Sequence, residues 1–311
     1  MIEIRDLTKT YGDRTAVDHL TVTVRPGVVT GFLGPNGAGK STTMRMIVGL
    51  DRPAAGQVLV NGRRYADHTA PLREVGALLE PRAFHPGRTA YSHLLALAAT
   101  GGFGKRRVHE VLAMVGLDQV AGKRTRGFSM GMGQRLGIAA ALLGDPAVVL
   151  LDEPINGLDP DGIRWVRGLL RHLADEGRTV FVSSHLMSEM ALTADHLIIL
   201  GRGRLLADVP MADMTAAATA VRVRTPEPER LSALLSGCRA AVTAEGDALT
   251  VTGRSAEDIA SLSLANQILV YELTPVHPSL EDAYLALTHH DVEYEPAATT
   301  VPTTSTRRAA A

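Results

Sequence analysis

The sequence predicts an α/β fold built around a mixed sheet, followed by a smaller α+β domain. Two apolar runs predict the first part: the run at 28–33 leads into a glycine-rich loop and a helix, and the run at 147–151 is apolar throughout. A wholly apolar run is typical of a parallel strand that is buried on both faces of a sheet. The third observation is a change of composition beyond Thr215, which predicts where the second domain begins.

Length and composition limit what this chain can be. Its 311 residues allow one α/β domain of about 200–220 residues and a smaller second domain. Hydrophobic residues make up 45% and charged residues 21%, as in an ordinary globular protein with a large core. The net charge of −1 gives no support to a nucleic-acid partner, since such partners usually require a basic face. The single cysteine, Cys238, excludes an intramolecular disulfide and fits a cytosolic setting.

The sequence shows no membrane-spanning or secretory signal. No apolar run approaches the roughly 20 residues that a transmembrane helix requires. The N-terminus lacks the basic start and the continuous apolar stretch of a signal peptide. We therefore expect that any work on a membrane is done by docking onto another protein that spans it.

The N-terminal segment alternates in the way of half-buried antiparallel strands. Ile2 and Ile4 alternate with charged residues, and residues 21–24 alternate as well. Tyr11 lies between the two runs. It is either an aromatic residue at a strand end or a ring that stacks on a purine base. The glycine-rich loop downstream favours the second interpretation.

Residues 34–42 read Gly-Pro-Asn-Gly-Ala-Gly-Lys-Ser-Thr and fill every fixed position of a phosphate-binding P-loop. The loop stands between a β-rich run and a helix, which is the context that this motif requires; the alternative is a glycine-rich turn that matches by accident. Backbone N–H groups at a helix N-terminus can bind a polyphosphate, Lys40 can reach its β- and γ-phosphates, and the Ser41 hydroxyl can ligate Mg²⁺. The candidate nucleotide-binding residues of the loop are Gly34, Asn36, Gly37, Ala38, Gly39, Lys40, Ser41 and Thr42.

Two strands are expected after the helix that follows the P-loop. The first, at 57–62, ends in Asn-Gly, which is a strong hairpin signal. The second, at 75–80, ends in Glu80. Ligands of parallel sheets gather at the carboxyl ends of the strands, so Glu80 is either a ligand-binding acid or a solvated loop acid.

Residues 89–145 have the pattern of a helical insert. Apolar residues within 108–115 follow the i, i+3, i+4, i+7 spacing of one helix face. The insert closes with Phe-Ser-Met-Gly-Met-Gly-Gln-Arg at 128–135 and a further helix. Ser129 is a candidate N-cap residue of that helix, which predicts a second helix N-terminus able to bind an anion.

Two acids and a histidine follow the next buried strands. Asp152 and Glu153 end the run at 147–151, and adjacent carboxylates at the tip of a buried strand are costly unless they bind metal or do chemistry. In a P-loop protein the first holds Mg²⁺ and the second orients and deprotonates the attacking water. The β-branched run at 179–183 leads to His185 at the same sheet edge. His185 has either a structural role or a γ-phosphate contact, and we favour the phosphate contact.

The complete set of motifs resembles the nucleotide-binding subunit of ABC transporters over about residues 1–215. The resemblance identifies an adenine-stacking aromatic, a Walker A loop, a Q-loop position, a signature, a Walker B strand with its catalytic glutamate, a D-loop and a switch histidine. In that order, these are Tyr11, 34–42, Glu80, 129–134, Asp152 with Glu153, Asp159 and His185. The segments 128–135 and 185–190 are similar to those of ATPases from bacitracin- and daunorubicin-type exporters.

The resemblance implies both the fold and the chemistry. The fold would be a P-loop NTPase ABC cassette with a mixed sheet core, an antiparallel β subdomain and a helical subdomain. ATP and Mg²⁺ would be the cofactors. The implied metal contacts are Ser41, Asp152 and Glu80, and the implied catalytic residues are Lys40, Glu153 and His185.

The sequence departs from the family pattern at two places. The consensus signature Leu-Ser-Gly-Gly-Gln becomes Phe-Ser-Met-Gly-Met at 128–132. Ser129 and Gly131, which the resemblance places on the γ-phosphate of a partner subunit's nucleotide, are retained, whereas the glutamine is replaced. Glu80 stands where the family usually has glutamine, and its carboxylate predicts a stronger dependence of nucleotide affinity on Mg²⁺.

The resemblance also implies partners. ATP at Lys40 of one copy would be covered by Ser129 and Gly131 of a second copy, so the chain would form a head-to-tail homodimer. The dimer would drive a separate ABC-2-type membrane permease, held near Glu80 at the cytoplasmic face of the cell membrane, and power efflux of an antibiotic or other amphipathic compound. One alternative is a soluble ABC-type ATPase switch acting on the ribosome or DNA. Another, a P-loop small-molecule kinase, leaves the signature segment and His185 unexplained.

The pattern changes to short strands and helices after a hairpin at 197–207. We expect one domain at 1–215, a second at 216–291 and a disordered tail at 292–311, which is rich in Pro, Thr, Ala and Arg. In the second domain, strands are expected at 221–224, 241–243, 249–252 and 268–271, and helices at 227–235, 256–264 and 280–288. This alternation predicts a small ferredoxin-like α+β domain, whose regulatory or dimer-stabilising role rests on analogy.

Overall fold

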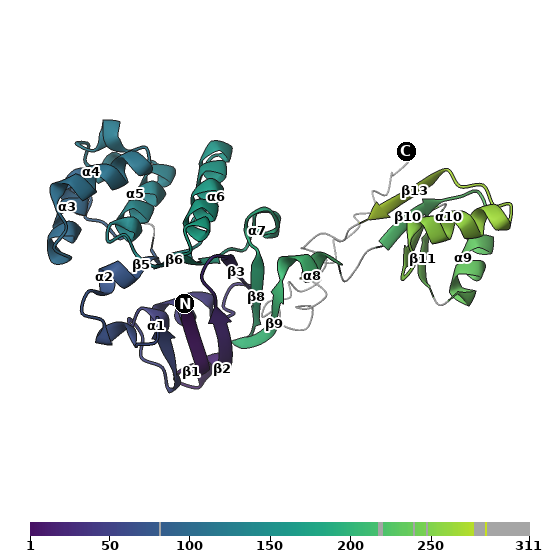
Figure 1. The fold of residues 1–311 in the computed structure, drawn as a ribbon, viewed down its shortest axis with the longest axis horizontal. Helices are drawn as coiled ribbons and strands as arrows, with labels where there is room; N and C mark the ends of the chain where they lie inside the picture. The colour runs from purple at the N-terminus through teal and green to yellow at the C-terminus, as the bar shows by residue number, and fades with distance from the viewer. Residues whose placement is uncertain (81, 217–219, 239, 247, 277–283, 285–311) are drawn as a thin grey trace, which may run out of the picture.

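Residues 1–216 form a cassette of two sheets and surrounding helices, and residues 220–276 form a separate small sheet (Figure 1). The computed structural model describes residues 1–80, 82–216, 220–238, 240–246, 248–276 and 284. Of the sequence predictions, the helix at 280–288 (apart from Tyr284) and the tail at 292–311 lie outside these residues.

The central sheet has the strand order β5-β6-β7-β3-β8-β9. The first five strands run parallel, and β9 pairs with β8 in the antiparallel direction. The sheet is therefore mixed, as the sequence predicts. Its strands are β3 (Val29–Leu33), β5 (Val75–Leu78), β6 (Val148–Asp152), β7 (Thr179–Ser183), β8 (His196–Gly201) and β9 (Arg204–Pro210).

Both faces of the central sheet are buried, which accounts for the apolar run in β6. Val149 and Leu151 belong to one hydrophobic core, and Val148 and Leu150 belong to the other. In Figure 1, helices lie over one face of the central sheet, and the antiparallel sheet that contains the N-terminal strands lies under the other. The helices of the cassette are α1 (Lys40–Ile47), α2 (Pro71–Glu74), α3 (Ala90–Thr100), α4 (Lys105–Met114), α5 (Met130–Leu142), α6 (Pro160–Asp175), α7 (Met187–Thr193) and α8 (Met211–Ala216).

A three-stranded antiparallel sheet with the order β2-β1-β4 covers the second face, as the alternating N-terminal pattern predicts. Its strands are β1 (Ile2–Tyr11), β2 (Arg14–Val24) and β4 (Ala55–Val60). The hairpin expected after 57–62 is only partly right. Asn61 and Gly62 do turn the chain, with φ of 48° and 80°, and close a bridge between Val60 and Arg63. A short 3₁₀ helix at Tyr65–Asp67 follows instead of a strand, because the chain leaves the sheet edge there.

The helical part of the cassette contains α3, α4 and α5, with short 3₁₀ helices at Asp118–Val120 and Thr125–Gly127. The apolar face predicted within 108–115 is buried in the core between these helices. Helix α5 also packs closely on β5. A Cβ atom at Gly76 of β5 would lie 2.0 Å from the carbonyl oxygen of Ala141, so only glycine permits this approach. The signature helix is thus fixed directly on the central sheet.

The register of the central strands gathers the functional segments at one edge. β7 lies between β6 and β3, and Ser183 of β7 is paired with Asp152 of β6 on one side and with Phe32 of β3 on the other. All three strands end at this level. The loop after β3, the acids at the end of β6 and the residues after β7 therefore meet at a common edge, as ligand sites of parallel sheets do.

The small sheet has the order β11-β12-β10-β13, and every neighbouring pair is antiparallel. Its side chains form a core with those of two helices, at 228–237 and 256–265, which confirms the predicted α+β character. The order of strands and helices matches the predicted ferredoxin-like topology. The elements are β10 (Ala220–Arg224), α9 (Pro228–Gly237), β11 (Ala241–Glu245), β12 (Ala248–Thr252), α10 (Ala256–Ala265) and β13 (Glu272–Val276).

The strand predicted at 268–271 is wrong. These residues form the turn after α10: Ile268 donates its N–H to the carbonyl of Ser263 at 2.9 Å and buries its side chain in the core. The strand begins only at Glu272. A run of four apolar residues fits a helix-capping turn as well as a strand, and its period alone does not distinguish them. The domain boundaries at 215 and 291 stay predictions.

None of the helices in the described parts of the chain is both long enough and apolar enough to cross a membrane.

Candidate active site

The P-loop connects β3 to α1, and its glycines are required by its backbone. Gly39 has φ of 101°, and a Cβ atom there would lie 2.4 Å from the carbonyl oxygen of Ala16 in β2. Gly37 has φ of 82°. Side chains rarely adopt such angles, so these positions favour glycine. Helix α1 begins at Lys40, and the loop therefore ends at a helix N-terminus, where backbone N–H groups and the helix dipole favour an anion.

A cavity of about 640 Å³ lies on the P-loop. It is large enough for a nucleotide, since ligand pockets typically measure about 300–1,000 Å³. It brings together most of the predicted nucleotide-binding residues with the two acids at the end of β6. The residues that line it are Tyr11, Arg14, Ala16, Pro35, Asn36, Gly37, Ala38, Gly39, Lys40, Ser41, Thr42, Leu79, Met130, Asp152, Glu153 and Asn156.

Lys40 is the buried cation of this cavity. Its Nζ donates hydrogen bonds to the carbonyl oxygens of Gly34 at 2.6 Å and Pro35 at 3.3 Å, and the residue is only 7% exposed. Burial lowers the pKa of Lys40 below its usual value, and the nearby carboxylates of Glu153 and Asp152 counteract part of this effect. When a polyphosphate binds, the ammonium group of Lys40 can exchange its hydrogen bonds to these carbonyl oxygens for bonds to phosphate oxygens.

Asp152 is held by two serine hydroxyls. The Oγ of Ser41 donates to Asp152 Oδ2 at 2.6 Å, and the Oγ of Ser183 donates to Asp152 Oδ1. The backbone N–H of Glu153 in turn donates to Ser183 Oγ at 2.9 Å. Asp152 is almost fully buried, so these bonds offset the cost of removing its carboxylate from water. The arrangement fixes one carboxylate next to Lys40 and the P-loop serine.

Glu153 and His185 form a pair beside Asp152. Nδ1 of His185 lies 2.8 Å from Oε2 of Glu153, and because a carboxylate only accepts, Nδ1 is the donor. Glu153 has φ of 51°, which is unusual for a residue with a side chain. This backbone conformation directs the carboxylate of Glu153 away from strand β6. Asp152 and Glu153 therefore have different surroundings. The structure thus places His185 on the predicted hydrolytic acid, whereas its predicted γ-phosphate contact stays a prediction.

Tyr11 forms one wall of the cavity and is about half exposed. Its hydroxyl donates to Asp51 Oδ2 at 3.0 Å, and the ammonium group of Lys9 lies 4.8 Å from the centre of its ring. These contacts fix the ring at the cavity rim, where a base could stack. The stacking role itself stays a prediction.

Ser129, Gly131 and Asp159 lie at the N-termini of two helices, α5 and α6, and none of these three residues lines the P-loop cavity. Ser129 caps α5, as predicted, by accepting a hydrogen bond from the N–H of Met132 at 3.2 Å. Asp159 caps α6 by accepting from the N–H of Gly162 at 2.8 Å. Gly131 packs against Leu158: a Cβ atom at Gly131 would lie only 3.3 Å from Leu158 Cδ2.

Glu80 is separate from the other predicted metal contacts. It lines a neighbouring apolar groove of about 550 Å³ and is not among the residues that line the P-loop cavity. The pKa of the Arg45 guanidinium is raised mainly by Asp51, and the charge of Glu80 adds a smaller effect in the same direction. Glu80 therefore does not share the P-loop cavity with Ser41 and Asp152, and its metal contact stays a prediction.

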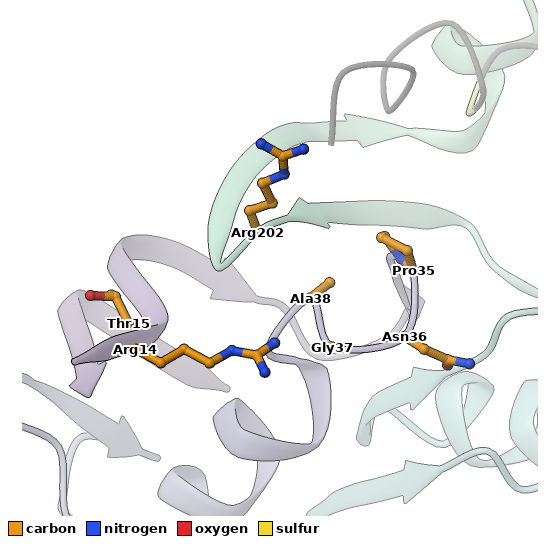
Figure 2. Close-up of a pocket in the computed structure, with 7 residues that line it drawn as sticks. All are labelled: Arg14, Thr15, Pro35, Asn36, Gly37, Ala38 and Arg202. Atoms are coloured by element: carbon orange, nitrogen blue, oxygen red, sulfur yellow. The ribbon is translucent and has the colours of Figure 1, made fainter. Parts of the chain in front are cut away.

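Two contributors to this site were not predicted from the sequence. Ser183 was assigned only to a strand end, although it joins Asp152 to the backbone of Glu153. Arg14, the first residue of β2, belongs to none of the motifs identified in the sequence. It lines both the P-loop cavity and an adjoining cavity of about 310 Å³, and Figure 2 shows its side chain reaching from β2 toward the P-loop. Its position three residues after Tyr11, the candidate for base stacking, is the one feature of the sequence that points to a role at the nucleotide site.

These features define a P-loop nucleotide-binding protein with an acid pair and a histidine at the sheet edge. Comparison with known families supports this class. The family described as "ABC transporter" matches residues 17–156. A family described as "Domain of unknown function (DUF8746)" matches residues 219–281, and one described as "AAA domain, putative AbiEii toxin, Type IV TA system" matches residues 124–191, which overlap the first family.

Curated relatives match much of the chain. The bacitracin transport ATP-binding protein BcrA of Bacillus licheniformis is 45% identical over 213 residues, which cover 68% of this chain and 70% of that protein. YhcH of Bacillus subtilis (strain 168), described as an uncharacterized ABC transporter ATP-binding protein, is 36% identical over 292 residues, which cover 93% of this chain and 96% of that protein.

Solved structures agree with the fold. One described as "Structure of ATP binding subunit of ABC transporter" matches with a TM-score of 0.64 and 29% identity over 70% of this chain and 92% of that chain. The dimeric structure of a post-hydrolysis state of the ATP-binding cassette MJ0796 bound to ADP and Pi matches with a TM-score of 0.62 and 26% identity over 68% of this chain and 99% of that chain. The chain therefore belongs to the ABC transporter ATP-binding family, and it is an ATPase.

Arg14 provides a test of how the cavity holds nucleotide. We expect Arg14→Ala to weaken the binding of ATP with Mg²⁺ by roughly tenfold, because the cavity loses a cation that can bind phosphate oxygens. Because Arg14 is exposed, we expect the unfolding temperature to fall by no more than roughly two degrees. Titration with a fluorescent ATP analogue measures the Kd. Arg202→Ala is the matched control, since Arg202 lines only the adjoining cavity. Equal affinities for Arg14→Ala and the unaltered chain would rule out this role.

Proposed function

We propose that this chain is the ATP-hydrolysing subunit of an exporter, and that it powers a separate ABC-2-type membrane permease from the cytoplasmic face of the cell membrane. The cargo class is an antibiotic or another amphipathic compound. The similarity to the bacitracin transport ATP-binding protein supports this class, as does the 34% identity over 206 residues to the lantibiotic transport ATP-binding protein SrtF of Streptococcus pyogenes.

The observation that carries the proposal is that Ser129 and Gly131 lie outside the P-loop cavity, so that the site consists of two halves. Lys40, Asp152 and Glu153 line the cavity, and at the N-terminus of α5 Met130 reaches it, whereas Ser129 and Gly131 do not line it. A second copy, arranged head to tail, would supply its Ser129 and Gly131 to the nucleotide of the first. The solved MJ0796 cassette is dimeric and bound to ADP and Pi, which supports a dimer for this chain as well.

The residues of the cavity have distinct roles in the hydrolysis that we propose. Lys40 holds the β- and γ-phosphates by donating from Nζ, and the P-loop N–H groups bind the remaining oxygens. Glu153 orients a water and accepts its proton as the water oxygen attacks the γ-phosphorus, while the bond between that phosphorus and the ADP oxygen breaks. His185 donates to the Glu153 carboxylate and keeps it in place.

A magnesium ion fits the donor set beside the P-loop. The Ser41 hydroxyl and the Asp152 carboxylate are hard oxygen donors only 2.6 Å apart at the cavity wall. Mg²⁺ in nucleotide sites typically takes one or two protein oxygens together with phosphate and water oxygens, which suits this pair. When bound, the ion neutralises charge on the phosphate oxygens. Ser41 and Asp152 would hold it, with Glu80 as a further contact if its loop moves toward the cavity.

The permease is proposed to dock in the apolar groove of about 550 Å³ that Glu80 lines. The groove lies between α2, β5 and the helices α3 and α5, and its lining includes Leu72, Phe84 and Leu97. An apolar groove of this kind suits a short amphipathic helix of a membrane protein. Leu79 lines both the groove and the P-loop cavity, so a partner in the groove would lie next to the nucleotide site.

The proposed dimer predicts a specific effect of Glu153→Gln. This variant should form a dimer with ATP and Mg²⁺ far more strongly than the unaltered chain, because it holds ATP but lacks the base that activates water. We expect its hydrolysis rate to fall by 10²-fold or more, roughly the contribution of a general base. Light scattering after size-exclusion chromatography measures the mass, with Glu257→Gln in α10 as the control.

The dimer result also separates the proposal from its failure. A Glu153→Gln chain that stays monomeric with ATP and Mg²⁺, even when its co-expressed membrane subunit is present, would contradict the two-half site. A variant that keeps the hydrolysis rate of the unaltered chain would instead contradict the role of Glu153.

The partner class is tested by sedimentation with inside-out membrane vesicles or with ribosomes from the cells that make this protein. We expect association with the vesicles, and Leu72→Glu should reduce it by roughly tenfold, because a charge in the groove opposes apolar docking. The control is Leu264→Glu in α10, which is exposed and far from the groove in sequence. Sedimentation with ribosomes instead would favour a soluble ABC-type switch.

A further inference from the structure

Gln134 of helix α5 touches the backbone of the hydrolytic acid. Its side chain is fully buried, and Nε2 donates a hydrogen bond to the carbonyl oxygen of Glu153 at 3.1 Å. The other end of the amide, Oε1, has no hydrogen-bond partner among the described residues. A buried amide that makes one bond and leaves its acceptor unpaired is costly, so its presence requires an explanation.

Glu153 needs to be held from several sides. Its φ of 51° lies in a sparsely populated region that persists only when the surroundings maintain it. The N–H of Glu153 is fixed by Ser183, its carboxylate by His185, and its carbonyl by Gln134 together with the N–H of Asn156 at 3.3 Å. Of these four residues that bond to Glu153, Gln134 is the one that belongs to the signature helix α5.

The packing around this bond joins the signature segment to the loop after Glu153. A Cβ atom at Gly157 would lie 2.3 Å from Met130 Sδ, and one at Gly131 would lie 3.3 Å from Leu158 Cδ2. The first residues of α5 therefore pack against residues 157 and 158, and Gln134, one turn further along the helix, provides a polar contact to Glu153.

We propose that Gln134 is a positioning residue that holds the backbone of Glu153 on the signature helix, so that the carboxylate faces the attacking water. This inference rests on the proposed hydrolytic role of Glu153. In the proposed dimer, Ser129 and Gly131 of the same helix contact the nucleotide of the partner. Gln134 thereby connects the N-terminus of α5, which engages one nucleotide, to the acid that hydrolyses the other.

A purely stabilising role fits the contacts less well. If the amide is replaced by an apolar group of the same size, the Glu153 carbonyl keeps its bond from Asn156, and the unpaired Oε1 disappears. Because the carbonyl keeps one donor and the unpaired acceptor disappears, we expect the replacement to change stability little. The loss is instead one of geometry at Glu153, where small displacements reduce the rate strongly.

The test compares Gln134→Leu with the unaltered chain. We expect kcat for ATP hydrolysis to fall by roughly tenfold or more, with KM and the Kd for ATP unchanged within about twofold and an unfolding temperature no lower than before. Gln119→Leu is the matched control, because Gln119 is an exposed glutamine elsewhere in the helical part, and its side chain donates to the neighbouring Asp118.

Gln134→Glu adds a readout that a structural role would not produce. A buried carboxyl group favours its neutral form, whose O–H can donate to the Glu153 carbonyl, whereas the ionised form repels it. The ratio of kcat for Gln134→Glu to kcat for the unaltered chain should therefore rise as the pH is lowered from about 8 to about 6.

Three results would overturn the proposal. The first is a Gln134→Leu variant that retains kcat, and the second is one in which kcat, affinity and unfolding temperature fall together. The third is a flat pH dependence of the kcat ratio for Gln134→Glu. Failure of the proposed function is visible separately, because the unaltered chain and Glu153→Gln would then hydrolyse ATP at the same rate.

Discussion

The hydrogen bonds around Ser183 are the interaction on which the rest of the site depends. The hydroxyl donates to Asp152 and accepts from the backbone N–H of Glu153, so it joins both acids to the strand that separates them from the P-loop. Two adjacent carboxylates in a partly buried edge would otherwise repel each other and lose their water. Through this one hydroxyl, Asp152 is directed toward Ser41 and Glu153 is turned toward His185.

The position of β7 makes this interaction available. Because β7 lies between β6 and β3, the residue at its end reaches the acids on one side and the P-loop strand on the other. The apolar residues of β6 fill two cores, one on each face, and so fix the strand against sliding. A register shift of one residue would exchange those two faces and remove Asp152 from Ser41. The core packing that fixes the register of β6 thus also fixes the geometry of the site.

The parts that could be predicted from the sequence are those encoded by short contiguous patterns. The P-loop, the acids after an apolar strand and the N-cap at Ser129 each follow from a few neighbouring residues, and the mixed sheet follows from the character of its strands. Ser183 and Gln134 act across 31 and 19 residues respectively, so their roles depend on strand register and helix packing that no local pattern contains. Arg14 likewise became visible only when β2 was placed beside the P-loop.

The errors have similar causes. The run at 268–271 has the composition of a strand, but a capping bond from Ile268 to Ser263 makes it the end of a helix. The Asn61-Gly62 turn was recognised correctly, while the strand expected after it is absent from the described residues because the chain leaves the sheet. Glu80 follows a parallel strand, but that strand, β5, ends at Leu78 and not at Glu80 as predicted, and it lies at the edge of the sheet, two positions from β7. The strand order, which the sequence did not reveal, decided which loop acids meet.

The most direct test of this account is the rate of ATP hydrolysis by Ser183→Ala, with Ser263→Ala, a buried serine of the small sheet domain, as the control. The account predicts that kcat falls by at least about tenfold, because Asp152 and the N–H of Glu153 each lose a partner, while Ser263→Ala hydrolyses ATP at the rate of the unaltered chain. A Ser183→Ala chain that hydrolyses ATP within twofold of the unaltered rate would show that the acids are held in some other way.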